Sequence, residues 1–202
     1  DASSTGVGGI WLIPGLPPTV YRHEWPPDVQ KFYKTAAITN SDLEMAGILV
    51  AWFVLESCSF LRHRAATIYS DNSPTVSWTQ KLISRSDKPT SSCLLRALAM
   101  RARTLESQVP VTLHWAGKHN RPADMASRSF DPNDPHFSPD DTRFLSIFNS
   151  AFPQPQSWQL RQIPPAPLSQ LMLTLAGKRL PLRQWTYQQE CGTGDFGATT
   201  AN

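Results

Sequence analysis

The sequence HNRPADMASR, residues 119–128, is the stretch that says most about the fold of this chain. Pro122 suits the first turn of a helix, because its ring fixes φ and its missing N–H would have no partner there. Asp124 then falls in that first turn, where a carboxylate is stabilised by the helix dipole. The block therefore predicts a helix that carries an acidic side chain near its beginning.

Three further acidic residues lie in separate blocks towards the N-terminus, and each marks the edge of an expected element. Asp71 directly follows an expected strand at residues 66–70 (ATIYS). Glu44 lies in NSDLEMAG, which opens an expected long helix, and Asp1 opens the stretch DASSTGVGGIW. Strand ends and helix beginnings can direct side chains to one point, so the pattern predicts that the four acids converge.

Each acid also has a simpler explanation. Ser41 and Glu44 have the spacing of a capping box, which taken singly is the favoured interpretation. Asp71 suits an Asx turn, and Asp1 a solvated chain end. Taken one at a time, these explanations do not account for the joint pattern, in which each block contributes one acid. Four convergent carboxylates form a natural cage for Mg²⁺, which prefers oxygen ligands.

The expected elements alternate between strand and helix, which predicts an α/β fold with helices over a mixed sheet. The expected strands are residues 7–14, 19–25, 66–70 and 110–115. The expected helices are residues 26–34, 40 to about 60, 91–107, one beginning at Pro122, and one with Ser73 as N-cap and Pro74 as first helical residue. The helix from residue 40 is apolar nearly all round and should be buried against a sheet.

The composition changes at about Phe130. Residues 131–135 (DPNDP) have the composition of a linker. Residues 140–152 and 167–177 are expected to form amphipathic helices, joined by a Pro-rich stretch. The last residues, 192–202, are rich in Gly, Thr and Ala and are expected to be disordered.

The bulk composition sets limits on the functional class. The chain has 202 residues, 40% of them hydrophobic, and a formal charge of +3, which permits a nucleic-acid partner without requiring one. Cys58, Cys93 and Cys191 are widely spaced with no CxxC, which favours reduced thiols and a cytoplasmic or nuclear location. The longest apolar run, residues 45–55, is too short to span a bilayer, so we expect no membrane association.

Taken together, the four blocks resemble those of the ribonuclease H family. Asp-Ala-Ser followed by Gly6, Gly8 and Gly9 matches the opening hairpin of that family, NSDLExxG matches its glutamate helix, and IYSDN matches its second aspartate strand. Residues 120–128 are similar to the N-x-x-A-D-x-x-S-R ending found in reverse-transcribing elements. The narrower resemblance is to a retroelement polyprotein of the tyrosine-recombinase kind, DIRS- or Ngaro-like.

The resemblance implies a domain organisation. It covers residues 1–130, which would form a ribonuclease H-like fold with a mixed central sheet flanked by helices. Residues 131–191 would form a helical, Pro-rich extension, and residues 192–202 a disordered linker. The chain opens inside a motif rather than on Met, so we expect a segment of a longer protein whose first strand is cut short at Asp1.

The resemblance also implies an activity, because family members cleave the RNA strand of RNA–DNA hybrids with two metal ions. Asp1, Glu44, Asp71 and Asp124 would be the ligands of two Mg²⁺ or Mn²⁺ ions, with Asp1 bridging both. Two such ions can activate a water and stabilise the attacked phosphate. The implied partners are the hybrid and, in cis, the reverse transcriptase and other domains of the polyprotein.

Several polar residues beside the acids are candidates for contact with the hybrid. His119 would assist proton transfer, although a surface histidine is at least as favoured. Small polar side chains can recognise the RNA 2′-hydroxyl, and basic ones the phosphates, but turn chemistry explains several of them equally well. The candidate substrate-binding residues are Ser3, Ser4, Asn72, Ser73, Asn120 and Arg128.

Two other functions compete with the nuclease. One is a catalytically silent ribonuclease H-like module that binds nucleic acid or connects domains of a polyprotein, against which the intact acids argue. The other is an integrase- or transposase-type core, which shares the fold. The Asn-x-x-Ala-Asp ending at residues 120–124 favours ribonuclease H over this third possibility.

Overall fold

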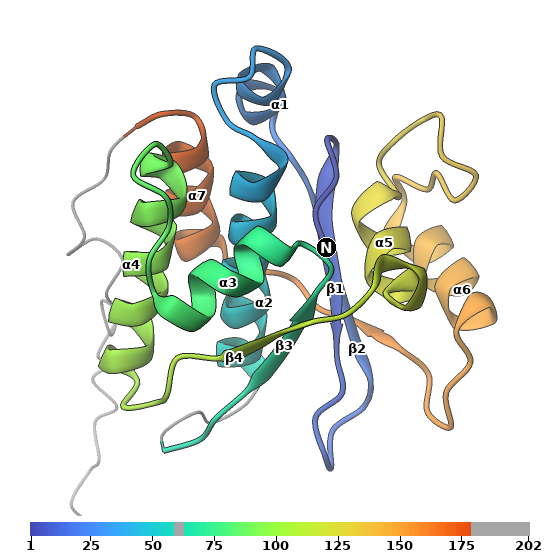
Figure 1. Ribbon diagram of the computed structural model, residues 1–202. Helices are drawn as coiled ribbons and strands as arrows, with labels where there is room; N and C mark the ends of the chain where they lie inside the picture. Colours follow the sequence, from blue (N-terminus) through green and yellow to red (C-terminus); the bar gives the residue numbers. More distant parts are fainter. Residues whose placement is uncertain (59–62, 179–202) are drawn as a thin grey trace, which may run out of the picture.

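A computed structural model describes residues 1–58 and 63–178 of the chain. The helices are α1 (Pro27–Lys34), α2 (Asn40–Cys58), α3 (Ser73–Lys81), α4 (Pro89–Thr104), α5 (Arg121–Arg128), α6 (Asp141–Ala151) and α7 (Pro165–Leu175), with a 3-10 turn η1 (Gly117–His119). The strands are β1 (Gly6–Trp11), β2 (Thr19–Glu24), β3 (Thr67–Ser70), β4 (Val111–His114) and β5 (Gln159–Leu160). The predicted α/β class, with a small mixed sheet flanked by helices, is confirmed (Figure 1).

The strands form two separate sheets instead of one central sheet. β1 pairs antiparallel with β2, and β2 pairs parallel with β5. β3 and β4 form a parallel pair of their own. The first residues also pair with β1, because Ala2 forms an isolated antiparallel bridge with Val7. Within the described part of the chain, no strand joins β1 to β3.

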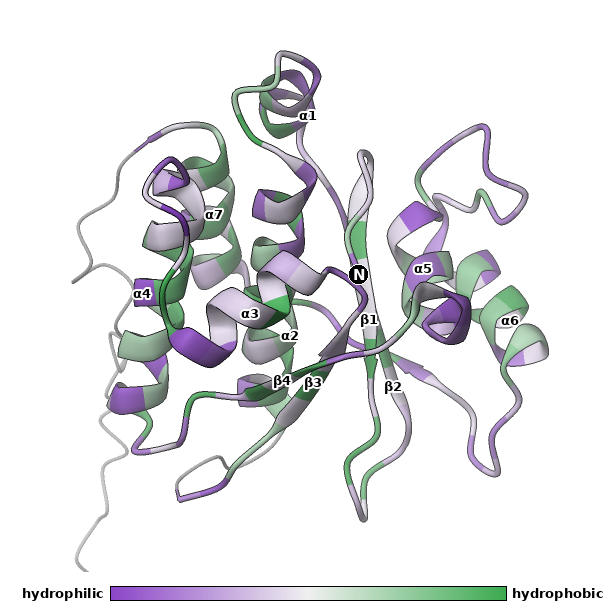
Figure 2. Ribbon diagram, in the orientation of Figure 1, coloured by the Kyte–Doolittle hydropathy of each residue, from purple (hydrophilic) through white to green (hydrophobic). Residues whose placement is uncertain are grey.

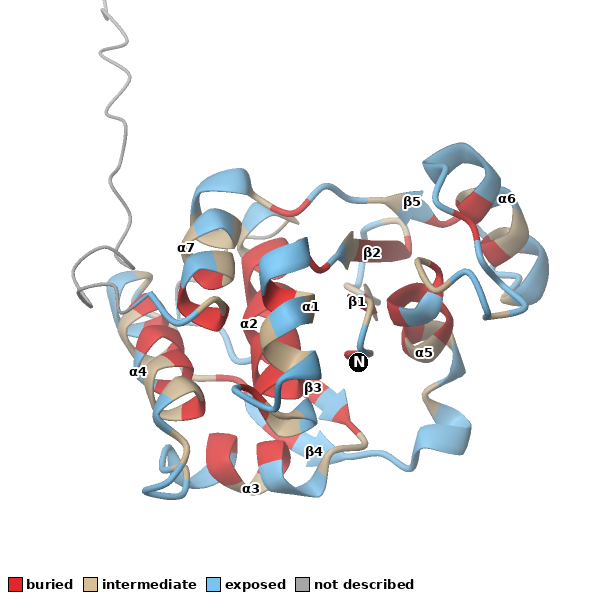
Figure 3. Ribbon diagram, turned by 90° about the horizontal axis from the view of Figure 1, so that it is seen from above, coloured by how far each residue is buried: buried red, intermediate tan, exposed pale blue. Residues whose placement is uncertain are grey.

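Helix α2 lies at the centre of the main core, as its apolar sequence predicts. Trp52 and Phe53 are fully buried, and the helix contacts β1, α4 and α7. Figure 2 shows its hydrophobic colouring, and Figure 3 shows α2 buried between β1 on one side and α4 and α7 on the other. Helix α2 therefore supports the first residues, which precede β1, and the acidic side chain that it carries itself.

A second core lies on the other face of β1 and β2, which places a helical layer on each side of this sheet. Val20 of β2 packs there with Ala126 of α5, Phe144 and Phe148 of α6, and Trp158 just before β5. The Phe148 and Trp158 rings meet edge to face, with their centroids 5.2 Å apart. The helix predicted from the HNRPADMASR block is therefore held against the first hairpin.

Arg22 of β2 joins the segment after residue 130 to the sheet. Its guanidinium is buried, donates to Ser129 Oγ at 2.9 Å and to the Ser138 carbonyl at 2.5 Å, and forms an ion pair with Asp141 at 2.7 Å. It also lies 4.0 Å from the centre of the Phe144 ring. Burying a guanidinium is costly unless its donors are satisfied, so this cluster fixes α6 in a defined place.

Three details differ from the sequence-based expectations. Asn72, and not Ser73, is the N-cap of α3, because its side chain accepts a hydrogen bond from the Thr75 N–H at 3.0 Å. Helix α4 already begins at Pro89, because proline is well suited to the first turn. Strand β5 lies in the Pro-rich stretch, where no strand was expected.

Some expectations cannot be compared with the structure. The predicted end of the long helix at Phe60, the thiol of Cys191 and the expected disorder at residues 192–202 lie outside the described residues. In the part that is described, none of the helices combines the length and the apolar character needed to cross a membrane.

Candidate metal site

Three of the four predicted ligands meet in the structure. Asp1, Glu44 and Asp71 each offer a carboxylate oxygen, and these oxygens lie within 4.8 Å of one another. Asp1 precedes β1, Glu44 belongs to α2, and Asp71 follows β3. The group is half-buried to buried, and its oxygen atoms are the donors that hard divalent cations prefer.

Glu44 is the most buried of the three. Its residue is 4% exposed, and this burial raises the pKa of its carboxyl group above the ordinary value. The N-terminal amino group and hydrogen bonds from the Ala2 N–H and the Asn40 side chain oppose the rise, whereas the Asp71 carboxylate adds to it. Such a carboxylate is poorly solvated and stands beside a like charge, so a cation would stabilise its ionised form.

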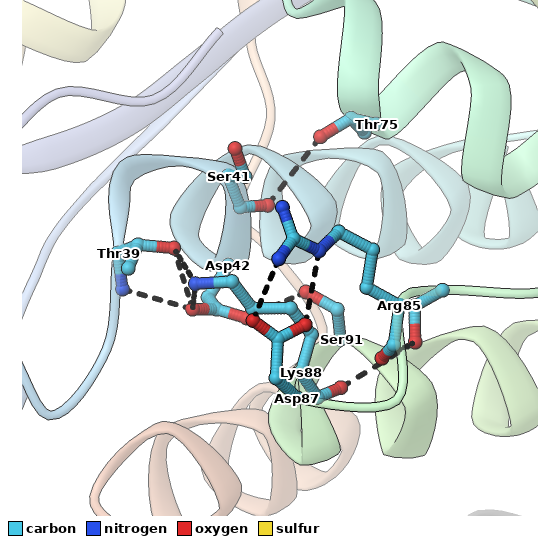
Figure 4. Close-up of polar contacts among 9 residues, drawn as sticks. Thr39, Ser41, Asp42, Thr75, Arg85, Asp87, Lys88 and Ser91 are labelled. Carbon is cyan, nitrogen blue, oxygen red and sulfur yellow. Dashed lines mark hydrogen bonds and ion pairs between the residues drawn. The ribbon is translucent and has the colours of Figure 1, made fainter.

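The capping box expected for Ser41 and Glu44 is not what holds the beginning of α2. Asp42 holds the beginning of the helix instead, because its Oδ2 accepts hydrogen bonds from the Thr39 N–H and the Thr39 hydroxyl, both at 2.8 Å (Figure 4). The bond from the Thr39 N–H to the Asp42 side chain is one half of a capping box, at positions two residues before those expected. Glu44 is therefore not needed as a helix cap.

The Asp42 side chain also ties α2 to α4. Ser91 of α4 donates to Asp42 Oδ1 at 2.5 Å, and Lys88 Nζ donates to the Thr39 hydroxyl at 3.0 Å (Figure 4). Lys88 Nζ lies 3.9 Å from Asp42 Oδ2, which pairs the buried carboxylate with a cation. This network fixes the first turn of α2 and hence the direction of Glu44 one turn further on.

Asp1 is held by both its backbone and its side chain. Its amino group donates to the Gly8 carbonyl at 2.9 Å, and the Gly8 N–H donates to the Asp1 carbonyl at 3.0 Å. Ser127 of α5 donates from its hydroxyl to Asp1 Oδ2. Ser127 was not among the predicted site residues, and only its place one turn after Asp124 in the same block points to it.

Asp71 lies against the turn that follows β4. A Cβ atom at Gly117 would come within 2.6 Å of Asp71 Oδ2, so only glycine leaves this carboxylate its present position. His114 Nε2 lies 3.2 Å from the Asp71 carbonyl oxygen. Gly117 was not predicted as a site residue, because a close approach between separate segments leaves no local signal.

Asp124 lies in the first turn of α5, as predicted, but is not a member of the group of three. Its Oδ1 accepts a hydrogen bond from Arg128 Nε at 2.5 Å, an ion pair between residues one helical turn apart. Helix α5 nevertheless reaches the group through Ser127. Asp124 therefore belongs to the helix that contacts the cluster, but its own charge is compensated by Arg128.

The predicted substrate contacts divide into two kinds. The Ser3 hydroxyl donates to the Ser127 carbonyl at 2.9 Å, and the Asn72 side chain caps α3, so both have structural partners. Ser4 and Ser73 are exposed, and so is the Arg128 side chain beyond its ion pair.

The cluster opens on a cavity of about 420 Å³, lined by Asp1, Glu44, His119 and Asn120 and by largely apolar side chains. The exposed ring of His119 lies 6.0 Å from the ring of Trp115. Asn120 Nδ2 is buried, and among the described residues it has no hydrogen-bond partner. Of the site residues predicted from the HNRPADMASR block, His119 and Asn120 thus reach the space next to the carboxylates.

Comparison of the chain with protein-family models, with curated proteins and with solved structures gives no match. Any function therefore has to be argued from the geometry of the site together with the motifs of the sequence.

Proposed function

We propose that the chain is a ribonuclease H-type endonuclease of a retroelement, which cleaves the RNA strand of an RNA–DNA hybrid with the help of divalent cations. The observation that carries the proposal is the meeting of Asp1, Glu44 and Asp71 within 4.8 Å. These three acids come from separate blocks whose motifs resemble that family. The two-sheet α/β arrangement is compatible with the ribonuclease H-like fold proposed for residues 1–130.

The donor set fits Mg²⁺ or Mn²⁺, because it consists of carboxylate oxygens alone. Asp1, Glu44 and Asp71 would hold the cations, which supply an activated water and stabilise charge on the attacked phosphate. Ser127 orients the Asp1 carboxylate for this purpose. Asp124, which lies on the helix that contacts Asp1, would be a further ligand if its ion pair with Arg128 were broken.

The hybrid would lie across the surface that carries the turn after β4 and the beginning of α5. Lys118 and Arg121 are exposed there and offer positive charge to phosphates. Asn120 Nδ2, which has no hydrogen-bond partner in the described part of the chain, offers a donor, and His119 offers an imidazole at the same cavity. The reverse transcriptase and other domains of the polyprotein would act in cis, in the cytoplasm or nucleus.

The test is cleavage of a labelled RNA–DNA hybrid in Mg²⁺ or Mn²⁺. Asp71→Asn should lower the cleavage rate by about a hundredfold or more, since loss of a residue that merely supports a metal ligand already costs roughly 10- to 100-fold. Asp28→Asn is the matched control, because Asp28 is exposed in the first turn of α1, and it should leave the rate unchanged. Equal rates for Asp71→Asn and the unmodified chain would refute the proposal.

A catalytically silent module is the second candidate, and the ion pair between Asp124 and Arg128 favours it. A carboxylate whose charge is already compensated contributes less to cation binding. This candidate predicts binding of the hybrid with no metal-dependent cleavage. The same assay, combined with a hybrid-binding measurement, separates the two.

A further inference from the structure

Strands β3 and β4 bury one face of their small sheet and leave the other face exposed. Ile68 of β3 and Thr112 of β4 are buried, and the pair of strands packs on α2 and α3. Because the side chains of a strand alternate between its two faces, the residues next to these turn to the opposite face. Figure 3 shows exposed, pale blue residues on both strands.

Large aromatic and aliphatic side chains make up this exposed face. Tyr69 is 50% exposed, Val111 49%, Trp115 45% and Leu113 39%. Tyr69 lies beside Leu113 in the parallel register, and Trp115, directly after β4, falls on the same side as Leu113. We call the surface made of these four residues the aromatic face. Neighbouring exposed apolar side chains, unlike scattered ones, mark a site of interaction.

Three rings follow one another from the middle of the aromatic face to the turn before α5. The Tyr69 and Trp115 rings have centroids 5.2 Å apart and planes at 68°, and the Trp115 and His119 rings have centroids 6.0 Å apart and planes at 66°. Rings that meet edge to face are not stacked on each other, so part of their flat surface stays open to solvent. Such open ring surfaces fit a nucleobase, because every base has a flat π-face that can stack on them.

The charge beside the aromatic face is positive. Residues 111–121 (VTLHWAGKHNR) include Lys118 and Arg121, both exposed, and contain no acidic residue. Strand β3 (TIYS) has no charged side chain, and the carboxylate of Asp71, which follows it, lies in the candidate metal group. A ligand that extends from the rings to the turn therefore meets cations, which suits the phosphates of a nucleic acid.

The aromatic face favours a single strand over a duplex. The bases of a duplex are stacked on one another, whereas unpaired bases can turn their faces to protein rings. RNA-binding domains use aromatic side chains on neighbouring strands of an open sheet in this way. A protein partner would use the aliphatic and the aromatic side chains alike and would not need the cations beside them, so the charge favours nucleic acid.

We propose that the aromatic face is a platform for single-stranded nucleic acid, on which unpaired bases stack on Tyr69 and Trp115 while Lys118 and Arg121 bind backbone phosphates. Stacking does not use the sugar hydroxyl, so RNA and DNA both bind. Tyr69 and Trp115 also line the cavity next to the carboxylates, so the platform holds a single-stranded end beside the candidate metal site. The proposal does not rest on the proposed function, because no metal ligand takes part in the binding.

The test measures the binding of short, labelled oligouridine and oligothymidine to the full chain by fluorescence anisotropy, in EDTA so that no metal-dependent cleavage occurs. Replacing both rings, Tyr69→Leu with Trp115→Leu, keeps apolar bulk but removes the stacking surfaces, and it should weaken both oligomers by about tenfold or more. The matched control, Tyr69→Phe with Trp115→Phe, keeps the rings and should bind within about threefold of the unmodified chain. Equal affinities of the Leu and Phe chains overturn the proposal.

The phosphate contacts have a test of their own. Lys118→Gln with Arg121→Gln should reduce the slope of log K against log salt by about 1.4, at roughly 0.7 for each phosphate contact of a single strand. Lys31→Gln with Lys34→Gln removes the same charge from exposed positions of α1 and should change the slope little. An unchanged slope in the first pair overturns the assignment of the phosphates to Lys118 and Arg121.

The same variants separate the platform from other uses of this face. A blunt RNA–DNA hybrid should bind the Leu and Phe chains equally, because its bases are paired, and a matching loss in the Leu chain would assign the face to the hybrid. Binding of oligouridine without oligothymidine would make the 2′-hydroxyl the recognised group and overturn a platform based on stacking. Self-association that the Leu chain loses, with oligonucleotide affinity unchanged, would assign the face to a second copy and overturn the proposal.

Discussion

Glu44 shows how one buried side chain links the pH of the solution to metal binding. Burial raises the pKa of its carboxyl group above 4.5, so the folded chain without metal holds this proton at higher pH than the unfolded chain does. Stability from this group is therefore present below the ordinary pKa and is lost as pH rises through the raised pKa. A bound cation opposes this loss, because it requires the ionised carboxylate.

We expect Mg²⁺ at a hundred times its dissociation constant to raise the free energy of unfolding by about 2.7 kcal/mol at neutral pH. The gain should shrink as pH falls towards the ordinary carboxyl pKa, since protons then compete with the metal. Glu44→Gln should remove most of the gain. Urea unfolding with and without Mg²⁺ over a pH series measures both effects, and an equal Mg²⁺ effect in Glu44→Gln would count against this ligand.

A second prediction at the residue scale concerns Gly117. Gly117→Ala places a Cβ atom 2.6 Å from Asp71 Oδ2, so the carboxylate has to turn away from its partners. We expect metal affinity, measured by calorimetric titration, to fall roughly tenfold, as for loss of a supporting contact at a metal site. The neighbouring Ala116→Ser is the control and should bind metal normally. An unchanged metal affinity in Gly117→Ala would show that metal binding does not require the present position of the Asp71 carboxylate.

At the scale of the element, the contact between β1 and α5 depends on the small size of Gly8. A Cβ atom at Gly8 would lie 2.5 Å from the backbone of Ala126, which cannot yield without moving the helix. Gly8→Ala should destabilise the fold by about 1–3 kcal/mol, the usual cost of overpacking. It should also lower cleavage, because α5 carries Ser127 and Asp124.

Denaturant unfolding and the cleavage assay together test this prediction. Gly47→Ala is the matched control, because the atom nearest to a Cβ there would be Val7 Cγ2, at an ordinary 3.7 Å. A Gly8→Ala chain that unfolds and cleaves like the unmodified one would mean that α5 and β1 are not in close contact.

The elements with a clear local pattern are those that the sequence predicts best. Helix α2 has an unbroken apolar run, and the short strand before Asp71 is followed by the turn residues Asp-Asn-Ser-Pro, so both follow from local pattern. The two residues of β5 carry no periodicity, and their pairing with β2 depends on α6 returning the chain to the sheet. Asn72 and Ser73 are equally good caps by type, and only the geometry of the turn selects Asn72.

The site was predictable to the extent that each ligand sits in its own motif. The sequence predicts that Asp1, Glu44 and Asp71 meet, and the structure brings them together. Their supports are not predictable in this way, because Ser127 and Gly117 act on residues that are distant in sequence. The same limit applies to Asp124. It was predicted as a metal ligand, but in the structure its carboxylate forms an ion pair with Arg128, four residues further along the same helix.

At the scale of the whole molecule, the buried Arg22 holds the residues beyond 130 onto the sheet. Arg22→Met should cost about 2–4 kcal/mol in the free energy of unfolding, somewhat below the usual loss for a broken buried pair, because Asp141 remains half exposed to solvent. Asp141→Asn should cost less, since Ser129 and the Ser138 carbonyl still satisfy the guanidinium.

Limited proteolysis provides the second measurement. Cleavage near residues 131–140 should become faster in Arg22→Met than in Asp141→Asn. Equal unfolding free energies for Arg22→Met and the unmodified chain would mean that the extension contributes nothing to the stability of the sheet.

The cap formed by Asp42 has a practical consequence for studying the site. Since Thr39, Lys88 and Ser91 anchor the start of α2 through Asp42, substitutions at Glu44 leave that anchor intact. A chain disabled at Glu44 should therefore keep its shape and still bind a hybrid that it can no longer cut. Such a chain would be suited to crystallisation in complex with an uncleaved hybrid.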